Sequence, residues 1–432
     1  MQSNTDLLKI AAEILEKKSP TLDADELKRF VQSYLDRREV FLAAAETNGS
    51  PLYIIDRETL IDRLHTFATE FFDQLNNVEM FYAVKSNNHP DLVKMVVKEK
   101  YGLDVSSGTE LQLAIEANAQ KIIFSGPGKT DDELALAAQH ADKVTILIDS
   151  FGELVRLDRA VHKAGVNIRA GIRLTTDENG LWRKFGIPLS ELEHFFAEAD
   201  RFNQIDLAGL QFHTSWNLNP VHQTAFIERL GQEIKRLSET RRARIRFIDI
   251  GGGYWPPQGE WLQSAGTPEG NLARVLSNNN TPTTHYRLPA AAIDEFAHAI
   301  ARALKKNIFK FLDCTIYLEP GRWICNDAMH ILLQVVDKKA DDLIITDAGT
   351  NSIGWERFET DYFPVINLSR PGLDEHGAYV LGSLCTPHDV WGYSFFGGGI
   401  EPCDYLLIPT QGAYTYSLRQ NFIKPLPDSV IV

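Results

Sequence analysis

The sequence predicts a (β/α)8 TIM-like barrel, followed by a C-terminal all-β domain and preceded by an N-terminal helical extension. From about residue 51, short apolar strands alternate with helical spacing, and so many such units in one run favour a closed parallel barrel. After residue 325 short strands separated by Gly and Pro turns take over. Before residue 51 two amphipathic stripes indicate helices. The expected domains are therefore 1–50, 51–323 and 324–432.

Composition and charge indicate a globular chain with a solvated, acidic exterior. The 432 residues suffice for two or three domains, with 44% hydrophobic and 24% charged residues. A net charge of −14 argues against a nucleic-acid partner. Neither a signal-like start nor a membrane-spanning run is evident, so we expect a cytoplasmic protein with no membrane partner. The cysteines show no Cys-x-x-Cys spacing and predict neither a metal site nor disulfides: Cys314, Cys325, Cys385 and Cys403.

The elements can be placed in order along the chain. Apolar residues at helical spacing predict two helices within residues 5–45, either a layer packed on the main domain or a partner-recruiting arm. The stretch 254–290, rich in Pro, Gly, Asn, Ser and Thr, predicts a long loop or insertion. The expected strands of the barrel run are 52–55, 81–84, 103–105, 122–124, 144–148, 168–174, 209–213 and 247–250, with 316–319 closing it. Those of the β domain are 331–336, 343–346, 378–381 and 405–408.

Chemistry-bearing residues are expected where the barrel strands end, because parallel barrels carry their functional groups in the loops that follow the strands. Each of these residues, taken singly, has an ordinary alternative: an exposed lysine, a satisfied core histidine, a plain glycine turn or an ion pair. The expected groups are Lys85, Asp104, Arg173, His213, Gly251, Gly252, Gly253, Glu319 and Arg322.

Together these residue types have one economical explanation, the cofactor pyridoxal phosphate. Lys85 would form the Schiff base and Glu319 would keep the pyridine nitrogen protonated. His213 would stack on the ring. The glycine triplet 251–253 and Arg322 would hold the phosphate.

Five motifs carry a family resemblance: Ala83-Val84-Lys85-Ser86-Asn87, Ser125-Gly126-Pro127-Gly128-Lys129, Asp249-Ile250-Gly251-Gly252-Gly253, Glu319-Pro320-Gly321-Arg322 and Asp347-Ala348-Gly349. From about residue 51 to the C-terminus the sequence resembles the fold-type III pyridoxal-phosphate decarboxylases, which include the diaminopimelate and ornithine decarboxylases. The resemblance implies a homodimer with shared active sites. It also implies that Asp104, Glu110 and Arg173 surround the cofactor, with Tyr414 near the phosphate.

By the same resemblance, Cys385 would enter the partner's site, and either Cys385 or Lys85 would reprotonate the α-carbon. The alternative for Cys385 is an inert buried thiol.

The motifs for substrate recognition depart from the family pattern. Trp355 and Glu359 stand where diaminopimelate decarboxylases carry an arginine and a tyrosine, and Thr386-Pro387-His388-Asp389 replaces Glu-Ser-Gly-Asp. The resemblance then implies a decarboxylase of a diamino or conjugated amino acid, such as a siderophore precursor of the citryl-diaminopropionate type or a polyamine precursor. Alternatives are a racemase of the same fold type, a decarboxylase of meso-diaminopimelate or of D- or L-ornithine or lysine, and a non-catalytic binding relative. The expected substrate contacts are Trp355, Glu359, Thr386, His388 and Asp389.

Overall fold

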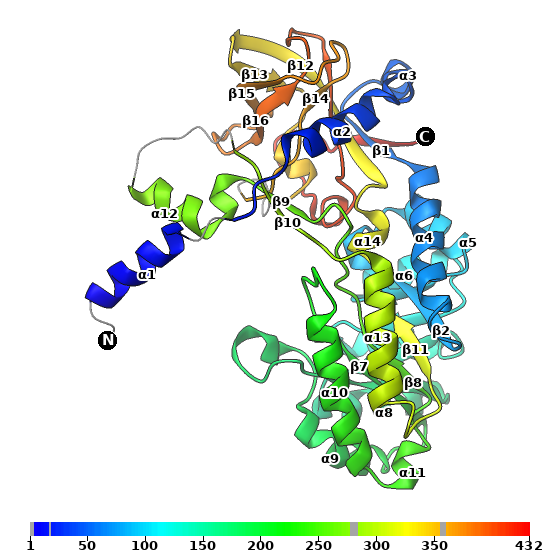
Figure 1. Ribbon diagram of the computed structural model, residues 1–432. Helices are drawn as coiled ribbons and strands as arrows, with labels where there is room; N and C mark the ends of the chain where they lie inside the picture. Colours follow the sequence, from blue (N-terminus) through cyan, green and yellow to red (C-terminus); the bar gives the residue numbers. More distant parts are fainter. Residues whose placement is uncertain (1–3, 17–18, 277–283, 355–359) are drawn as a thin grey trace. The chain divides into compact units, whose positions relative to one another are not determined.

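The computed structural model describes residues 4–16, 19–276, 284–354 and 360–432 (Figure 1). The chain divides into two compact units. The barrel unit comprises Ile61–Pro257 and Ala291–Cys325, and the sheet unit comprises Met1–Leu60, Gln258–Ala290 and Asn326–Val432. Among the described residues, none of the helices combines the length and apolar character needed to cross a bilayer.

The barrel unit is closed by eight parallel strands in the order β11-β2-β3-β4-β5-β6-β7-β8, which confirms the predicted barrel. Its strands are β2 (Val78–Ala83), β3 (Gly102–Val105), β4 (Ile122–Phe124), β5 (Val144–Ile148), β6 (Ile168–Leu174), β7 (Ile205–Phe212), β8 (Phe247–Asp249) and β11 (Thr315–Leu318). Its helices are α4 (Arg57–Phe72, which begins in the sheet unit), α5 (Pro90–Lys98), α6 (Gly108–Glu116), α7 (Asp131–Gln139), α8 (Phe151–Ala164), α9 (Leu192–Ala199), α10 (Val221–Arg236), α11 (Glu239–Arg242), α13 (Ile293–Asn307) and α14 (Arg322–Cys325). Short 3-10 turns are η1 (Val84–Ser86), η2 (Gly180–Lys184) and η3 (Leu189–Glu191).

Three successive barrel helices start at the same local signal. A Ser or Thr side chain accepts a hydrogen bond from the backbone N–H of a Glu three residues later, which satisfies an otherwise orphaned donor of the first turn. This cap fixes where each loop after a strand ends and its helix begins. The pairs are Ser107 and Glu110 in α6, Thr130 and Glu133 in α7, and Ser150 and Glu153 in α8.

The barrel interior is filled by side chains that alternate along the strands. The rings of Phe247 and Tyr317 stack with centroids 4.6 Å apart. Gly209 leaves room for this pair, because a Cβ there would lie 2.3 Å from the ring of Phe247. Since side chains alternate between the two faces of a strand, the residues two positions further along each strand also point inward and form a second layer. The apolar layer consists of Phe81, Ile123, Leu147, Ala208, Phe247 and Tyr317.

The sheet unit contains an eight-stranded sheet in the order β13-β15-β16-β14-β17-β12-β1-β18, which confirms a separate β domain. Its strands are β1 (Leu52–Ile55), β12 (Met329–Ala340), β13 (Leu343–Thr346), β14 (Ile366–Asn367), β15 (Glu375–Leu381), β16 (Val390–Phe396), β17 (Tyr405–Ile408) and β18 (Asp428–Ile431), with a separate ribbon of β9 (Glu260–Leu262) and β10 (Tyr286–Leu288). Its helices are α1 (Asn4–Glu16), α2 (Ala24–Leu35), α3 (Arg38–Asn48) and α12 (Pro268–Leu276), and its 3-10 turns are η4 (Ser264–Gly266), η5 (Thr350–Ser352) and η6 (Tyr416–Leu418).

The structure adds β14, β16 and β18 to the strands predicted for the β domain, and it differs from the prediction at three further places. Residues 52–55 are predicted as the first strand of the barrel run, but β1 pairs antiparallel with β12 and parallel with β18 in the sheet unit. All four of its residues are buried, and a short apolar run does not reveal its partner. The region 258–290, predicted as a loop, contributes β9, α12 and β10 to the sheet unit. The N-terminal region forms three helices instead of two, and α2 and α3 share a buried core with the sheet.

A buried carboxylate, Asp56, links the end of β1 to its neighbours in the sheet unit. Asp56 is 1% exposed, and its Oδ2 lies 2.6 Å from Nη1 of Arg37 and 4.0 Å from Nε2 of His330. The backbone N–H of Thr59 donates to Oδ1 at 3.0 Å. Burial by itself would raise the pKa of Asp56, but these three partners hold it well below its usual range.

We expect Asp56→Asn to cost about 2 kcal/mol of unfolding free energy at pH 7. Because the folded-state pKa is depressed, the ionised carboxyl stabilises the fold above the unfolded pKa of about 3.9, and this stability is lost as the pH falls through the folded pKa. Denaturant unfolding at pH 7 and at decreasing pH below 4 should show the difference from wild type shrinking. The exposed Asp62→Asn serves as control. An equal loss at every pH would contradict the assignment.

Candidate active site

The candidate active site of the barrel unit begins where β2 ends. The chain turns through η1, and Oγ of Ser86 donates to the carbonyl of Ala83 at 2.6 Å, which stabilises the turn. Lys85 lies in this turn with its side chain 32% exposed. Its Nζ donates to Oδ2 of Asp104, at the end of β3, at 2.7 Å. The lysine amine is therefore held at the C-terminal mouth of the barrel.

Asp104 connects three strands. Its other oxygen, Oδ1, accepts a hydrogen bond from Oγ of Ser125, just beyond β4. Nη1 of Arg173, on β6, donates to the carbonyl of Ser125. Burial raises the pKa of Asp104 and the charge of Glu319 adds to this, while Lys85 and Ser125 oppose it. The predicted group of Lys85, Asp104 and Arg173 is thus brought together, with Ser125 as an additional member.

A buried ion pair lies behind this group. The side chains of Lys129 and Glu153 are each 1% exposed, and Nζ of Lys129 lies 2.8 Å from Oε1 of Glu153. The same amine donates to the carbonyl of Leu147, on β5, at 2.9 Å. Burial lowers the pKa of Lys129 and raises that of Glu153, and their mutual attraction opposes both shifts. The pair joins the loop after β4 to helix α8 beneath the site.

His213 and Glu319 follow β7 and β11. Nδ1 of His213 accepts a hydrogen bond from the backbone N–H of Gly252 at 3.2 Å. Oε2 of Glu319 lies 3.6 Å from the same Nδ1, which is longer than a hydrogen bond. Burial lowers the pKa of His213 although Glu319 opposes this shift, and an Nδ1 that accepts from Gly252 carries no proton, so the imidazole is neutral in this arrangement. Nε2 of Gln211 donates to Oε1 of Glu319 at 3.4 Å.

Two of the three backbone N–H groups of the glycine triplet form hydrogen bonds within the protein. The N–H of Gly251 donates to Oδ1 of Asp249 at 2.8 Å, and the N–H of Gly252 is engaged by His213. Within the part of the chain that the structure describes, no hydrogen bond engages the N–H of Gly253, which has φ +82°. Of the three glycines predicted to hold the phosphate, Gly253 is therefore the one whose N–H could donate to it without losing a hydrogen bond within the protein.

Arg322, the other predicted phosphate ligand, lies on an aromatic surface. Its guanidinium carbon is 4.3 Å from the ring centroid of Trp255 and 5.8 Å from that of Trp216. Trp216 has φ +55° and is 54% exposed. The two indoles thus hold the guanidinium by cation–π contacts at the C-terminal mouth of the barrel.

The donor set of the barrel unit fits pyridoxal phosphate. The cofactor needs a primary amine for its aldehyde, an anionic group for its ring nitrogen and donors for its phosphate. Lys85 supplies the amine, Glu319 the buried carboxyl group, and Gly253 with Arg322 donors for an anion. A Cβ on Gly252 would lie 2.1 Å from the carbonyl oxygen of Glu319, so the backbone approach that forms this mouth requires glycine.

The remaining predicted residues lie in the sheet unit. Cys385, in the loop between β15 and β16, is exposed, which excludes the alternative of an inert buried thiol in this chain. Thr386 is half-buried and His388 is exposed in the same loop. Tyr414 is half-buried with φ +58°, a left-handed conformation that a non-glycine residue adopts rarely. Trp355 and Glu359 lie outside the described residues.

Asp389, predicted as a substrate contact, supports this loop instead. It is 1% exposed. Its Oδ1 accepts from the N–H and hydroxyl of Thr350 at 2.7 and 3.0 Å, and its Oδ2 accepts from the N–H of Leu384 at 2.7 Å. Because donors of its own unit occupy both oxygens, the carboxylate fixes the loop that presents Cys385.

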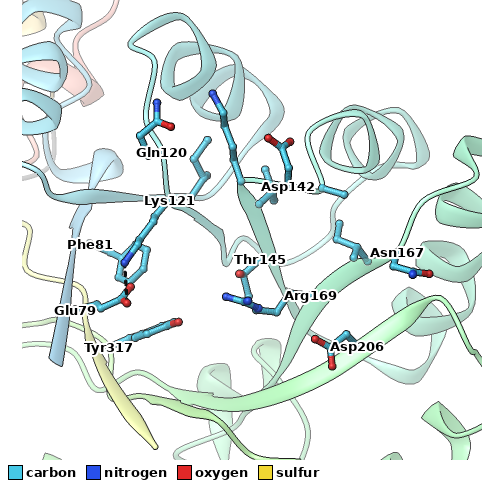
Figure 2. Close-up of a pocket in the computed structure, with 15 residues that line it drawn as sticks. Glu79, Phe81, Gln120, Lys121, Asp142, Thr145, Asn167, Arg169, Asp206 and Tyr317 are labelled. Atoms are coloured by element: carbon cyan, nitrogen blue, oxygen red, sulfur yellow. Dashed lines mark ion pairs between the residues drawn. The ribbon is translucent and has the colours of Figure 1, made fainter. Parts of the chain in front are cut away.

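A pocket of about 450 Å³ lies at the opposite, N-terminal mouth of the barrel. Figure 2 shows the side chains that line it. Its charged lining includes Glu79, Lys121, Arg169 and Asp206, and Lys121 pairs with Glu79 at 2.7 Å. Barrel enzymes perform their chemistry at the C-terminal ends of the strands, where Lys85 and Glu319 lie. Within the described ranges no cluster of three or more His, Cys, Asp or Glu side chains could hold a metal ion. We therefore place the reaction at the mouth around Lys85.

The parallel barrel and the donor set around Lys85 fit an enzyme that uses a carbonyl cofactor. A family model described as "Pyridoxal-dependent decarboxylase, pyridoxal binding domain" matches residues 57–326, and the chain belongs to this family. It is a carboxy-lyase that uses pyridoxal phosphate.

Similar proteins extend over nearly the whole chain. Diaminopimelate decarboxylase of Aquifex aeolicus is 24% identical, covering 97% of this chain and 94% of that protein. L-glutamyl-[BtrI acyl-carrier protein] decarboxylase of Niallia circulans is 25% identical, covering 89% and 88%. Among solved structures, Helicobacter pylori diaminopimelate decarboxylase complexed with L-lysine shares the fold with a TM-score of 0.72 at 21% identity, covering 91% of this chain and 94% of that chain.

Proposed function

We propose that the protein removes the α-carboxylate of a diamino acid or of a conjugated amino acid, releasing an amine and carbon dioxide. The observation that carries the proposal is the group formed by Lys85, Asp104 and Glu319 at the C-terminal mouth of the barrel, with Nζ of Lys85 2.7 Å from Oδ2 of Asp104. Family membership supports decarboxylation over racemisation, the alternative reaction that the same cofactor supports.

Bound pyridoxal phosphate supplies an electron sink for the electron pair left on the α-carbon when carbon dioxide departs. The residues of the chain hold and orient the reactants. Lys85 attaches the cofactor, and Asp104 keeps the lysine amine at the mouth. Glu319, whose pKa lies below its usual range although burial alone would raise it, presents a negative charge to the ring nitrogen. Neutral His213 offers a flat ring without a competing charge.

The changed recognition residues support a substrate whose distal group differs from that of diaminopimelate. The loop after Cys385 carries Thr386 and His388 in place of the family's Glu-Ser-Gly, so the carboxylate that would bind a distal ammonium is missing from it. In the barrel unit, Trp216 presents an exposed aromatic ring beside Arg322, whose guanidinium also contacts the buried Trp255. Such an exposed ring suits a larger, acylated substrate, of which a citryl-diaminopropionate type siderophore precursor is one example. A relative whose name specifies a glutamyl group carried on a protein shows that conjugated substrates occur in similar proteins.

We also propose a homodimer in which the exposed Cys385 completes the site of the partner. Cys385→Ala should then lower kcat by about 10²-fold, because an acid for the α-carbon is lost, while cofactor retention is unchanged. Steady-state kinetics and cofactor content test this. Cys403→Ala, another exposed cysteine, is the matched control. An unchanged kcat for Cys385→Ala would remove the cysteine from the reaction.

The function is tested by measuring carbon dioxide release from a substrate panel with the cofactor-loaded protein. The panel holds meso-diaminopimelate, both enantiomers of ornithine and lysine, and diaminopropionate acylated on its side-chain nitrogen with citrate. Faster turnover of the acylated compound than of the free diamino acids supports the proposal. Preference for meso-diaminopimelate would overturn the proposed specificity. Loss of optical activity without carbon dioxide release would establish the racemase.

A further inference from the structure

Two buried carboxyl groups, Asp249 and Glu319, lie side by side at the barrel mouth. Strands β8 and β11 are neighbours, with Asp249 opposite Tyr317 in the register. Phe247 and Tyr317 point inward and stack, so by strand alternation Asp249 and Glu319 form the next inward layer on the same two strands. Backbone hydrogen bonds hold the two strand ends together, since the N–H of Ile250 donates to the carbonyl of Tyr317 and the N–H of Glu319 donates to the carbonyl of Gly251, each at 3.0 Å. Asp249 is 0% exposed and Glu319 is 2% exposed.

A hydrogen bond between these groups requires a proton on one of them, because two ionised carboxylates offer acceptors alone. Oδ1 of Asp249 accepts from the N–H of Gly251 at 2.8 Å. Oδ2 of Asp249 is buried, and among the residues that the structure describes no group donates to it. A buried carboxyl oxygen that meets another carboxyl group and no donor is the expected place for a proton.

The surrounding groups decide which carboxyl group is ionised. Burial opposes the ionised form of Glu319, but the positive charge of Lys85 favours it, whereas the negative charges of Glu319 and Asp104 disfavour the ionised form of Asp249. Burial and the neighbouring Glu319 raise the pKa of Asp249 well above its usual range. Glu319 also accepts from Gln211 at 3.4 Å, at the long end of hydrogen bonding.

We propose that Asp249 is a protonated carboxylic acid at neutral pH, and that its Oδ2–H donates to Glu319 and keeps that carboxylate ionised and aimed at the cofactor ring nitrogen. Asp249 is then a positioning residue, because it acts through Glu319. The second half of this inference rests on the role of Glu319 in the proposed function. The first half, the location of the proton, does not depend on it.

The proton is tested on cofactor-free protein by comparing wild type with Asp249→Asn, whose amide offers the same acceptor to Gly251 and a donor to Glu319. An acid with a raised folded-state pKa gives stability that is complete below the unfolded pKa, near 3.9, and falls as the pH rises toward the folded value. The stability of the asparagine variant does not fall with pH in this way, because its amide does not titrate. Its unfolding constant relative to wild type should therefore fall by about tenfold for each pH unit between pH 5 and pH 8. A ratio independent of pH would overturn the proposal.

An infrared measurement covers the case in which the variant does not fold. When the wild-type protein is made with aspartate carrying 13C in its side-chain carboxyl group, the infrared bands of aspartate shift and those of glutamate do not. A protonated-aspartate C=O band at pH 7 that persists in Asp104→Asn is expected. The absence of this band would overturn the proposal.

The positioning role is tested by cofactor affinity. Asp249→Leu keeps a side chain that branches at the same carbon but removes the donor, and we expect its dissociation constant for pyridoxal phosphate to rise by about tenfold, against less than about threefold for Asp249→Asn. Equal weakening in both variants would reject the hydrogen bond as the cause. If the proton is found but neither variant changes cofactor affinity, the failure lies with the assigned role of Glu319 and not with the carboxyl pair.

Discussion

Lys85→Ala is expected to lower turnover on the order of 10³-fold or more and to leave a protein that loses pyridoxal phosphate during gel filtration. Nζ of Lys85 is the amine held at the active mouth, 2.7 Å from Oδ2 of Asp104. The measurement is the content of cofactor that borohydride reduction fixes to the protein, followed by mass analysis of the peptide that carries it. Retention of reducible, covalently attached cofactor by the alanine variant would contradict the assignment.

Two further variants separate charge from covalent attachment. Lys85→Arg keeps a cation beside Asp104 but lacks a primary amine, so we expect it to lose the linkage as alanine does. Lys121→Ala removes a lysine from the opposite mouth, where its side chain is 60% exposed and paired with Glu79. This control should keep both the cofactor and the turnover of wild type.

Gly252→Ala is expected to weaken cofactor binding by at least about 100-fold, because the added methyl group cannot be accommodated. Its Cβ would lie 2.1 Å from the carbonyl oxygen of Glu319, and backbone must move to relieve this contact. The shift would displace both the N–H that His213 accepts and the carboxyl group of Glu319. Equilibrium dialysis with pyridoxal phosphate and far-ultraviolet circular dichroism would separate a distorted site from an unfolded chain.

Gly152→Ala is the matched control for this substitution. Gly152 lies in the first turn of α8, where the nearest atom to an added Cβ is Oγ of Ser150 at 3.8 Å. It should bind the cofactor as wild type does, and helix propensity favours alanine there. Wild-type affinity in Gly252→Ala would show that the mouth tolerates a shift of its backbone.

The barrel was predictable because its evidence is local and repeated. Alternating short apolar runs and capped helices specify each β-α unit, and the inward parity of the strands places Lys85, Asp104 and Glu319 at one mouth. The partner of β1 was not predictable, since residues 52–55 are buried on all sides and fit either sheet. Strand β16 was also missed, because its aromatic residues suggest a pocket lining or a core equally well. In the structure Trp391 is buried, and its Nε1 donates to the carbonyl of Ala348 at 2.9 Å.

The sequence predicted which residue types form the site better than it predicted how their side chains and backbone groups are arranged. Sequence motifs contain Asp249 and Ser125, but they do not state which backbone N–H faces a ligand and which bonds within the protein. Gly251 and Gly252 have internal partners, and Asp389 is occupied by its own loop. These facts depend on contacts between strands and loops distant in sequence. Strand parity is the signal that could have identified Asp249, which is two residues beyond the inward Phe247.

The three-segment composition of the sheet unit has a consequence for biosynthesis. Strand β1 leaves the ribosome early, yet its partners are β12 and β18, and the register with β18 joins Leu52 to Asp428. The barrel unit is complete in sequence at Cys325. A nascent chain can therefore close the barrel before the strands that pair with β1 have been translated. Until then α2, α3 and β1 lack the sheet against which they pack. Strand β18 completes the sheet beside β1 only after the whole barrel unit, which lies between them in sequence, has been translated.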